Sequence, residues 1–166
     1  MIARRSLLLA SLGTACVRRL PGVESFRLFM DDLPLATANA VPFVPSALEG
    51  RVVLVTFIAT WCFPCLAEMR VIKRLQRDYV EQGFSNVLVG MDLEGPAVLG
   101  PFASGYELDD IPVLVAGDRL RSGETAFGRI RELPSRVLFS REGEVAVAYS
   151  GVASYSSLDA VVRKLL

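Results

Sequence analysis

The clearest hydrophobic pattern in this chain lies between residues 52 and 83. Seven consecutive apolar or β-branched residues, 52–58, are bounded by turn residues, which is typical of a strand buried on both faces of a sheet. After a short connection, apolar residues recur three or four positions apart from Leu66 to Tyr79, with charged residues between them. This spacing predicts an amphipathic helix that begins near Phe63, packs one face on the sheet and stops at Gly83.

Shorter patterns extend this architecture toward the C-terminus. Apolar runs predict further strands, the last two forming a hairpin around Gly143, at residues 86–91, 111–116, 133–140 and 145–149. Helices are expected at residues 96–104, 121–130 and 156–166. Since a strand–helix–strand order requires a right-handed crossover and parallel pairing, the chain is predicted to form an α/β fold, with a central mixed sheet and helices on both faces.

The segment before the central strand gives weaker patterns. Residues 26–29 alternate in the manner of a strand, and we expect a turn at residues 31–34 to end it. Farther along, Ser46 is expected to cap a single helical turn that Gly50 ends before the central strand begins.

Two cysteines three positions apart, Cys62 and Cys65, stand at the junction of the central strand and the long helix. If the helix begins near Phe63, Cys62 lies at its N-cap, where unpaired backbone N–H groups and the helix dipole favour a thiolate. Cys65 lies one turn deeper, and Pro64 suits the first turn because its missing N–H needs no partner there. The spacing therefore predicts a redox-active dithiol, in which Cys62 attacks a disulfide and Cys65 resolves the intermediate.

A zinc site is one alternative role for two cysteines at this spacing. A Cys-x-x-Cys pair can supply half of such a site, but the chain has no His and only one further cysteine, Cys16, so four ligands cannot be assembled. The second alternative is that two core cysteines fall three apart by chance. We expect no metal, and no cofactor other than the redox-active Cys62–Cys65 disulfide.

Length and charge narrow the function classes further. The 166 residues fit one domain, and 52% of them are hydrophobic, which is enough to build a core. Basic and acidic residues are equal in number, 18 each, so the sequence has no electrostatic footprint for nucleic acid.

The first 16 residues have the three parts of an export signal: a basic start, a short apolar run and small residues before Cys16. The Arg4-Arg5 pair suggests the twin-arginine route. The small residues resemble a bacterial lipoprotein cleavage site, although Leu12 lies four positions before Cys16 rather than three. We expect an export signal over residues 1–16, a spacer over 17–24 and one domain over 25–166; a short N-terminal core helix is the alternative.

Export would place the protein in the periplasm or on the outer face of the membrane. It would be tethered through a lipid on Cys16, tethered through an uncleaved signal, or present in a plain exported form. Disulfides persist in such compartments. Because only two cysteines follow Cys16, the chain has no structural disulfide framework to maintain. The pair is therefore expected to be reactive rather than structural.

Around the dithiol the residues resemble the thioredoxin superfamily, and within it the exported TlpA-like and ResA-like thiol–disulfide oxidoreductases. The resemblance covers roughly residues 25–166 and depends on two blocks: residues 50–69, with the Trp-Cys-Phe-Pro-Cys run, and Leu133-Pro134-Ser135 with Gly143 behind it. It implies a thioredoxin-like fold.

The resemblance also implies the residues that meet a substrate. Pro134 would be the family's cis-proline, facing the dithiol and leaving the backbone of Leu133 free to pair with an extended substrate segment. Trp61 and Phe63, on either side of Cys62, are expected to contact the substrate as well. Without the resemblance, an ordinary trans proline at the start of an edge strand would be preferred.

Two features depart from the family pattern. Thioredoxin has a buried acid six residues before its first active cysteine, where this chain has Thr56, which cannot titrate. Glu68, three residues after Cys65, is a candidate substitute for proton transfer, and a solvated helix charge explains it equally well. The dipeptide between the cysteines is also unlike the usual Gly-Pro or Pro-Pro, which leaves the redox potential and the direction of electron flow open.

The function expected from the resemblance is reduction of disulfide-containing substrate proteins, with a membrane thiol transporter as electron donor. A frequent role in the family is to keep apocytochrome cysteines reduced for haem attachment; envelope redox homeostasis is another. A peroxiredoxin-like thiol peroxidase would need Thr at the position of Ala59. A copper-delivery protein would need a distant His, and the intact dithiol counts against a non-catalytic binding module.

Overall fold

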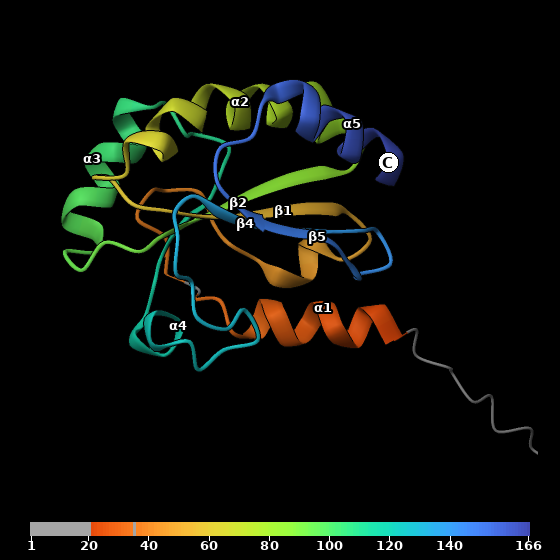
Figure 1. Cartoon of the computed structure of the whole chain (residues 1–166), viewed down its shortest axis with the longest axis horizontal. Helices are drawn as coiled ribbons and strands as arrows, with labels where there is room; N and C mark the ends of the chain where they lie inside the picture. The colour runs from red at the N-terminus through yellow and green to blue at the C-terminus, as the bar shows by residue number, and fades with distance from the viewer. Residues whose placement is uncertain (1–20, 35) are drawn as a thin grey trace, which may run out of the picture.

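In the computed structural model, which describes residues 21–34 and 36–166, a five-stranded sheet lies between two layers of helices (Figure 1). The strands are β1 (Val52–Ile58), β2 (Phe84–Gly90), β3 (Val113–Val115), β4 (Ser135–Phe139) and β5 (Val145–Ser150). The helices are α1 (Pro21–Asp31), α2 (Phe63–Tyr79), α3 (Pro96–Gly105), α4 (Asp118–Ser122) and α5 (Tyr155–Leu165). Short 3₁₀ turns precede β1 and follow α2, namely η1 (Pro45–Leu48) and η2 (Val80–Gln82).

The strand order across the sheet is β3-β2-β1-β4-β5. β1, β2 and β3 are parallel, whereas β4 runs antiparallel to β1 and β5 antiparallel to β4. Helices α2, α3 and α5 cover one face, and α1 and α4 cover the other (Figure 1). The predicted fold class, a mixed sheet with helices on both faces, is confirmed.

All seven residues of β1 are buried, as expected for a strand in the middle of such a sheet. Val53, Val55 and Phe57 belong to the core beneath α1. In that core Phe26 of α1 meets Phe139 of β4 edge to face, with ring centroids 5.4 Å apart. The alternate residues of β1 point to the other face, where Ile58 packs with Cys65 and Met69 of α2.

The long helix α2 has the predicted amphipathic form. Its inner side, Met69, Ile72 and Leu75, is buried against the sheet. After the 3₁₀ turn η2 the helical segment ends at Gly83, whose φ of 89° lies in the left-handed region that glycine adopts most readily. The predicted helix stop is therefore confirmed.

Four local predictions were wrong. Residues 26–29 form part of α1 rather than a strand, and α1 begins at Pro21, inside the segment 17–24 that was expected to be a spacer. The helix predicted over 121–130 is only the five-residue α4, which ends at Gly123. Ser46 does not cap η1: Val44 occupies the N-cap and no side-chain oxygen caps the turn.

The remaining predictions hold with shifted ends. The strands at 86–91 and 111–116 became β2 and the three-residue β3, and the hairpin is β4 and β5. α3 continues past Pro101, and the C-terminal helix α5 begins one residue earlier than expected.

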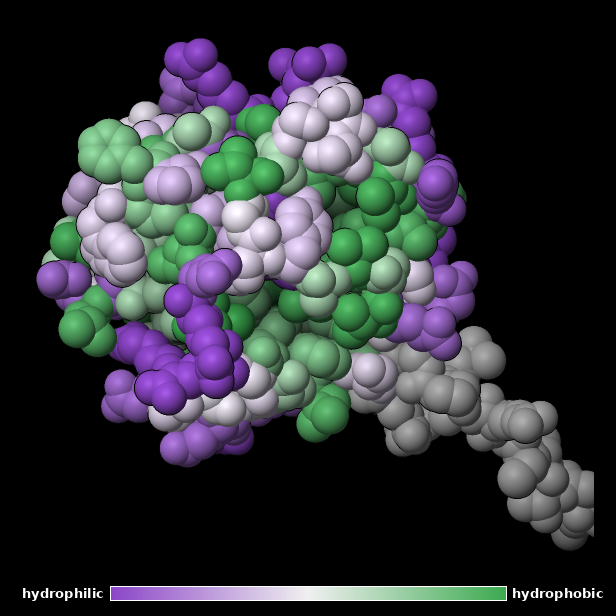
Figure 2. Space-filling view, viewed as in Figure 1, coloured by the Kyte–Doolittle hydropathy of each residue, from purple (hydrophilic) through white to green (hydrophobic). Residues whose placement is uncertain are grey.

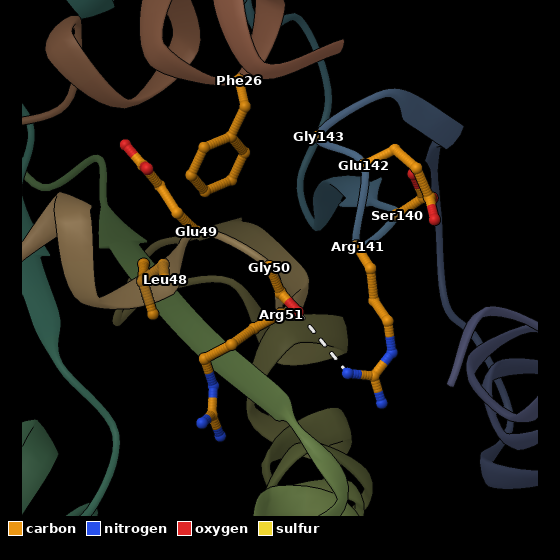
Figure 3. A pocket seen from close by; sticks show the side chains of 9 residues that line it. All are labelled: Phe26, Leu48, Glu49, Gly50, Arg51, Ser140, Arg141, Glu142 and Gly143. Carbon is orange, nitrogen blue, oxygen red and sulfur yellow. Dashed lines mark hydrogen bonds between the residues drawn. The ribbon is translucent and has the colours of Figure 1, made fainter. Parts of the chain in front are cut away.

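The amino end of β1 is closed by a side chain from the β4–β5 turn. Arg141 donates hydrogen bonds to the backbone oxygens of Gly50, Gln82 and Leu166, at 3.5, 2.7 and 3.1 Å. Figure 3 draws the one to Gly50. The hollow that remains among these residues has a volume of only about 10 Å³, close to that of a single water probe.

Within the described ranges, no helix has both the length and the apolar character needed to cross a bilayer. The predicted export signal, residues 1–16 with Cys16, lies outside the described residues.

Candidate active site

The structure joins Cys62 and Cys65 in a disulfide, with their Cα atoms 5.2 Å apart. As predicted, Cys62 is the N-cap of α2, and its Sγ accepts a hydrogen bond from the Cys65 backbone N–H at 3.2 Å. Pro64 lies in the first turn, where no N–H is needed. Cys62 is 5% exposed and Cys65 is fully buried, so the sulfur at the helix start is the one that an incoming disulfide can reach.

The turn that leads from β1 to Cys62 is held by Asp92, a residue that the sequence patterns did not single out. Its buried carboxylate accepts hydrogen bonds from the Thr60 backbone N–H at 3.1 and 3.2 Å and from the Thr60 hydroxyl at 2.6 Å. Asp92 follows β2 closely, and β2 is the parallel neighbour of β1. A polar residue at the carboxyl end of a neighbouring parallel strand is the signal by which it could have been found.

A groove of about 590 Å³ opens beside Cys62. It is lined by three residues of the dithiol segment besides Cys62 and by residues of two other loops: Trp61, Phe63, Pro64, Met91, Ile130, Arg131 and Leu133. Trp61 and Phe63 are 69% and 82% exposed, unusually high values for large aromatic residues. The structure thus brings Trp61, Phe63 and Leu133 together around the same groove as Cys62.

The Leu133–Pro134 peptide bond is cis, as the resemblance implied. Pro134 is buried, and its carbonyl oxygen accepts a hydrogen bond from the Gly151 N–H at 2.8 Å. The backbone of Leu133 makes no hydrogen bond to another described residue. The polar backbone groups of Leu133 are therefore available at the groove, where an extended peptide could pair with them.

Glu68 is not a solvated helix charge. Its carboxylate is buried and forms an ion pair with Arg136 of β4, with Nη2 and Oε2 2.5 Å apart. The other carboxylate oxygen accepts a hydrogen bond from the backbone N–H of Ala153. Since Arg136 lies two residues after Pro134, this pair ties the dithiol helix to the segment that carries the cis-proline.

Arg136 is the second residue that the sequence patterns did not reveal. It is as buried as Glu68, and its Nη1 donates a hydrogen bond to the Tyr149 hydroxyl at 3.0 Å. In the sheet Arg136 lies opposite Thr56. Thr56 is the residue at the position where thioredoxin has its buried acid. No local sequence pattern indicates the ion pair between Glu68 and Arg136, because the two residues are 68 positions apart and meet only in the folded chain.

The described residues contain no cluster of His, Cys, Asp and Glu able to hold a metal ion. What the site does present is a disulfide at a helix start, a neighbouring groove and an unpaired peptide backbone at the groove wall. These three features together suit exchange of disulfide bonds with a polypeptide.

The fold and this site are those of a thioredoxin-like protein. The Redoxin family model matches residues 19–162, and the chain belongs to this family. It is similar to the thiol-disulfide oxidoreductase ResA of Oceanobacillus iheyensis, with 30% identity over 121 residues, which are 72% of this chain and 60% of that protein. ResA of Halalkalibacterium halodurans is 32% identical over 104 residues, 63% of this chain and 56% of that one.

Among solved structures, a thiol:disulfide interchange protein of the thioredoxin family from Chlorobium tepidum TLS is similar, with a TM-score of 0.62 and 25% identity. The match covers 75% of this chain and 86% of that one. The predicted thioredoxin-like fold and the resemblance to the ResA-like group are confirmed. The chain spans 60% and 56% of the lengths of the two ResA proteins it matches.

Proposed function

We propose that this protein is a thiol–disulfide oxidoreductase that reduces disulfides in other proteins through Cys62 and Cys65. The observation that carries the proposal is the Cys62–Cys65 disulfide at the start of α2, beside an open groove. The similarity to proteins named thiol-disulfide oxidoreductases supports it.

In the reduced protein, the Cys62 thiolate attacks one sulfur of a substrate disulfide. That S–S bond breaks, the other substrate sulfur leaves as a thiolate and takes up a proton, and a mixed disulfide forms. Cys65 then loses its proton and attacks Cys62 Sγ, which releases the second substrate thiol and leaves the Cys62–Cys65 disulfide seen in the structure. Two electrons pass to the substrate in each cycle, and a thiol donor must return them.

The groove residues have defined parts in this scheme. Trp61 and Phe63 offer apolar contacts for side chains beside the substrate cysteine, and the backbone at Leu133 pairs with the substrate chain next to Pro134. Glu68 acts as the acceptor for the Cys65 proton during resolution.

Substrate and donor follow from the same proposal. A disulfide-containing protein of the cell envelope, such as an apocytochrome awaiting haem, is the substrate, and a membrane thiol transporter is the donor. Export through residues 1–16, with Cys16 as the lipidation site, would place the domain at the outer face of the membrane. Membrane fractionation of a Cys16→Ala variant tests the tether, because loss of the lipid should move the protein from the membrane to the soluble fraction.

Reduction of insulin disulfides by the full chain tests the activity. Cys62→Ser should abolish turnover, because no attacking thiolate remains. Cys65→Ser should retain the attack but accumulate mixed disulfides with substrate proteins. Cys16→Ser is the matched control and should turn over like the wild type. Full turnover by Cys62→Ser would contradict the proposal.

A further inference from the structure

The groove beside Cys62 has an electrostatic asymmetry. Of the described residues that line it, Arg131 alone is charged; the others are apolar, aromatic or cysteine. Arg131 is exposed and forms no ion pair with any other described residue. A cation that forms no ion pair with the described part of the chain, in an otherwise apolar groove, creates a field that acts on any charge the groove receives.

The loop that presents Arg131 is anchored at several points. Gly123 starts it with a φ of 87°, and a Cβ there would lie 2.9 Å from the Cα of Arg129. The side chain of Phe127 packs edge to face on Phe29 and on Phe57, with ring centroids 4.9 and 5.1 Å apart. This anchoring gives Arg131 a defined place at the wall of the groove. In Figure 2 one group of hydrophilic side chains lies at the lower left of the view, over α4 and the loop that follows it, and others lie along the top and right edges.

A second groove, of about 460 Å³, continues from the first. The two share Ile130 and Arg131, and the second runs along β4 and β5 as far as Ser150. Exposed Arg129 lines only this second groove, together with Glu132, so the charges there are of both signs. Arg131 therefore stands where a peptide leaving the dithiol would cross from one groove to the next.

We propose that Arg131 makes this protein selective for substrate disulfides whose flanking residues include a carboxylate. The occupant of the groove is an extended segment of a substrate protein, with an apolar side chain against Trp61 or Phe63 and an acidic side chain at Arg131. A guanidinium binds a carboxylate with paired hydrogen bonds, whereas a basic side chain at the same place would be repelled. The inference rests on the proposed function and specifies its substrate class.

Three synthetic peptides provide the test. Each is a disulfide-linked dimer with one Phe before its Cys, and the peptides differ only in whether Asp, Ser or Lys follows the Cys. Their reduction by the full chain, kept reduced by a chemical dithiol, gives kcat/KM for each. The wild type should prefer Asp over Lys, and Arg131→Glu should shift that ratio by about tenfold toward Lys at low ionic strength, the product of two opposed surface-charge effects. Added salt should weaken the preference.

Arg129→Glu is the matched control, because it makes the same charge change two residues away on the same loop, outside the dithiol groove. Arg131→Gln should fall between the wild type and Arg131→Glu. An unchanged Asp-to-Lys ratio in Arg131→Glu, or an equal shift in Arg129→Glu, would overturn the inference. The uncharged Ser peptide separates the two proposals: its reduction at similar rates in all variants supports the oxidoreductase function, and failure of the wild type to reduce any peptide would refute that function itself.

Discussion

The two ends of strand β1 are built for opposite purposes. At its carboxyl end the chain runs into Cys62 and a groove of about 590 Å³, with Trp61 and Phe63 largely exposed. At its amino end, around Gly50, the hollow is about 10 Å³ and Arg141 closes it (Figure 3). One strand thus has a reactive, open end and a sealed, hydrogen-bonded end.

The difference lies in which backbone groups are satisfied by the protein itself. At the closed end two arginines donate to carbonyl oxygens: Arg141 to those of Gln82 and Leu166, and Arg51 to those of Val80 and Phe84, the latter pair at 2.9 and 2.8 Å. At the open end the backbone of Leu133 is left without a partner among the described residues. The closed end therefore satisfies its backbone polar groups within the protein, whereas the open end leaves those of Leu133 available for binding.

The largest effect is expected from breaking the buried ion pair near the open end. Arg136→Met leaves the Glu68 carboxylate buried without its cation, and we expect the free energy of unfolding to fall by about 3–5 kcal/mol. Urea denaturation followed by circular dichroism measures this. Glu68→Gln should cost a similar amount, because it leaves the guanidinium unpaired.

The double variant Glu68→Gln/Arg136→Met serves as the control for that prediction. If the pair acts as a unit, the double variant should be more stable than the sum of the single losses implies, since neither charge remains buried. Strict additivity of the two losses would show that the residues do not interact.

A smaller effect is expected at the closed end. Arg141→Met removes hydrogen bonds to three carbonyl oxygens and should lower the free energy of unfolding by about 1–3 kcal/mol, while the reaction of Cys62 with a neutral alkylating reagent stays at the wild-type rate. Asp92→Asn is the counterpart at the open end: it weakens the hold on Thr60, so the alkylation rate of Cys62 should change. Equal effects of the two variants on that rate would remove the distinction between the ends.

The smallest effect concerns pH and two carboxyls where α2 meets α5. The hydrogen bond from the Tyr155 hydroxyl, followed by those from Arg77 and Arg74, lowers the pKa of Asp78 below its usual 3.8. The hydrogen bond from Tyr79 lowers the pKa of Asp159 in the same way. Carboxyls with a lowered pKa in the folded state stabilise it above their ordinary pKa, and this contribution is lost as the pH falls through the lowered value.

The urea midpoint should therefore decline as the pH drops below about 4, and the decline should be shallower in Asp78→Asn/Asp159→Asn than in the wild type. Both carboxyls are at the protein surface, so the difference is modest and should diminish in high salt. A wild type and double variant with parallel acid curves would show that these two carboxyls do not contribute.

Much of the fold was predictable where a local pattern and the tertiary structure agree. An uninterrupted apolar run gave β1, a three-to-four spacing gave α2, and the turn at Gly143 gave the hairpin. At residues 26–29 the window was too short: Phe26, Phe29, Met30 and Leu33 follow a helical spacing that only the longer segment shows. In the region 121–130 the sequence contains a helix-stop signal, Gly123, which ends α4. The apolar residues around Gly123 nevertheless suggested a longer helix.

The site, like the fold, was predictable where a local sequence pattern agrees with the tertiary structure. The two cysteines are recognisable from adjacent residues, because their chemistry depends on a helix start. The cis bond at Pro134 followed only from the family resemblance, since the local sequence favoured an ordinary trans proline. Burial of Glu68 was not predictable, because its partner Arg136 comes from a distant strand and resembles any polar strand residue in the sequence. Asp92 acts across two neighbouring strands and shows its role only once their parallel pairing is known.

The position of Trp61 has a practical consequence. It is the only tryptophan of the chain, it precedes Cys62 and it faces solvent at the groove. Tryptophan fluorescence therefore originates from a single place, the rim where sulfur chemistry is proposed to occur, and from no other part of the molecule. The single tryptophan is thus an intrinsic fluorescent probe, which reports on the dithiol and on molecules that bind beside it without an attached dye.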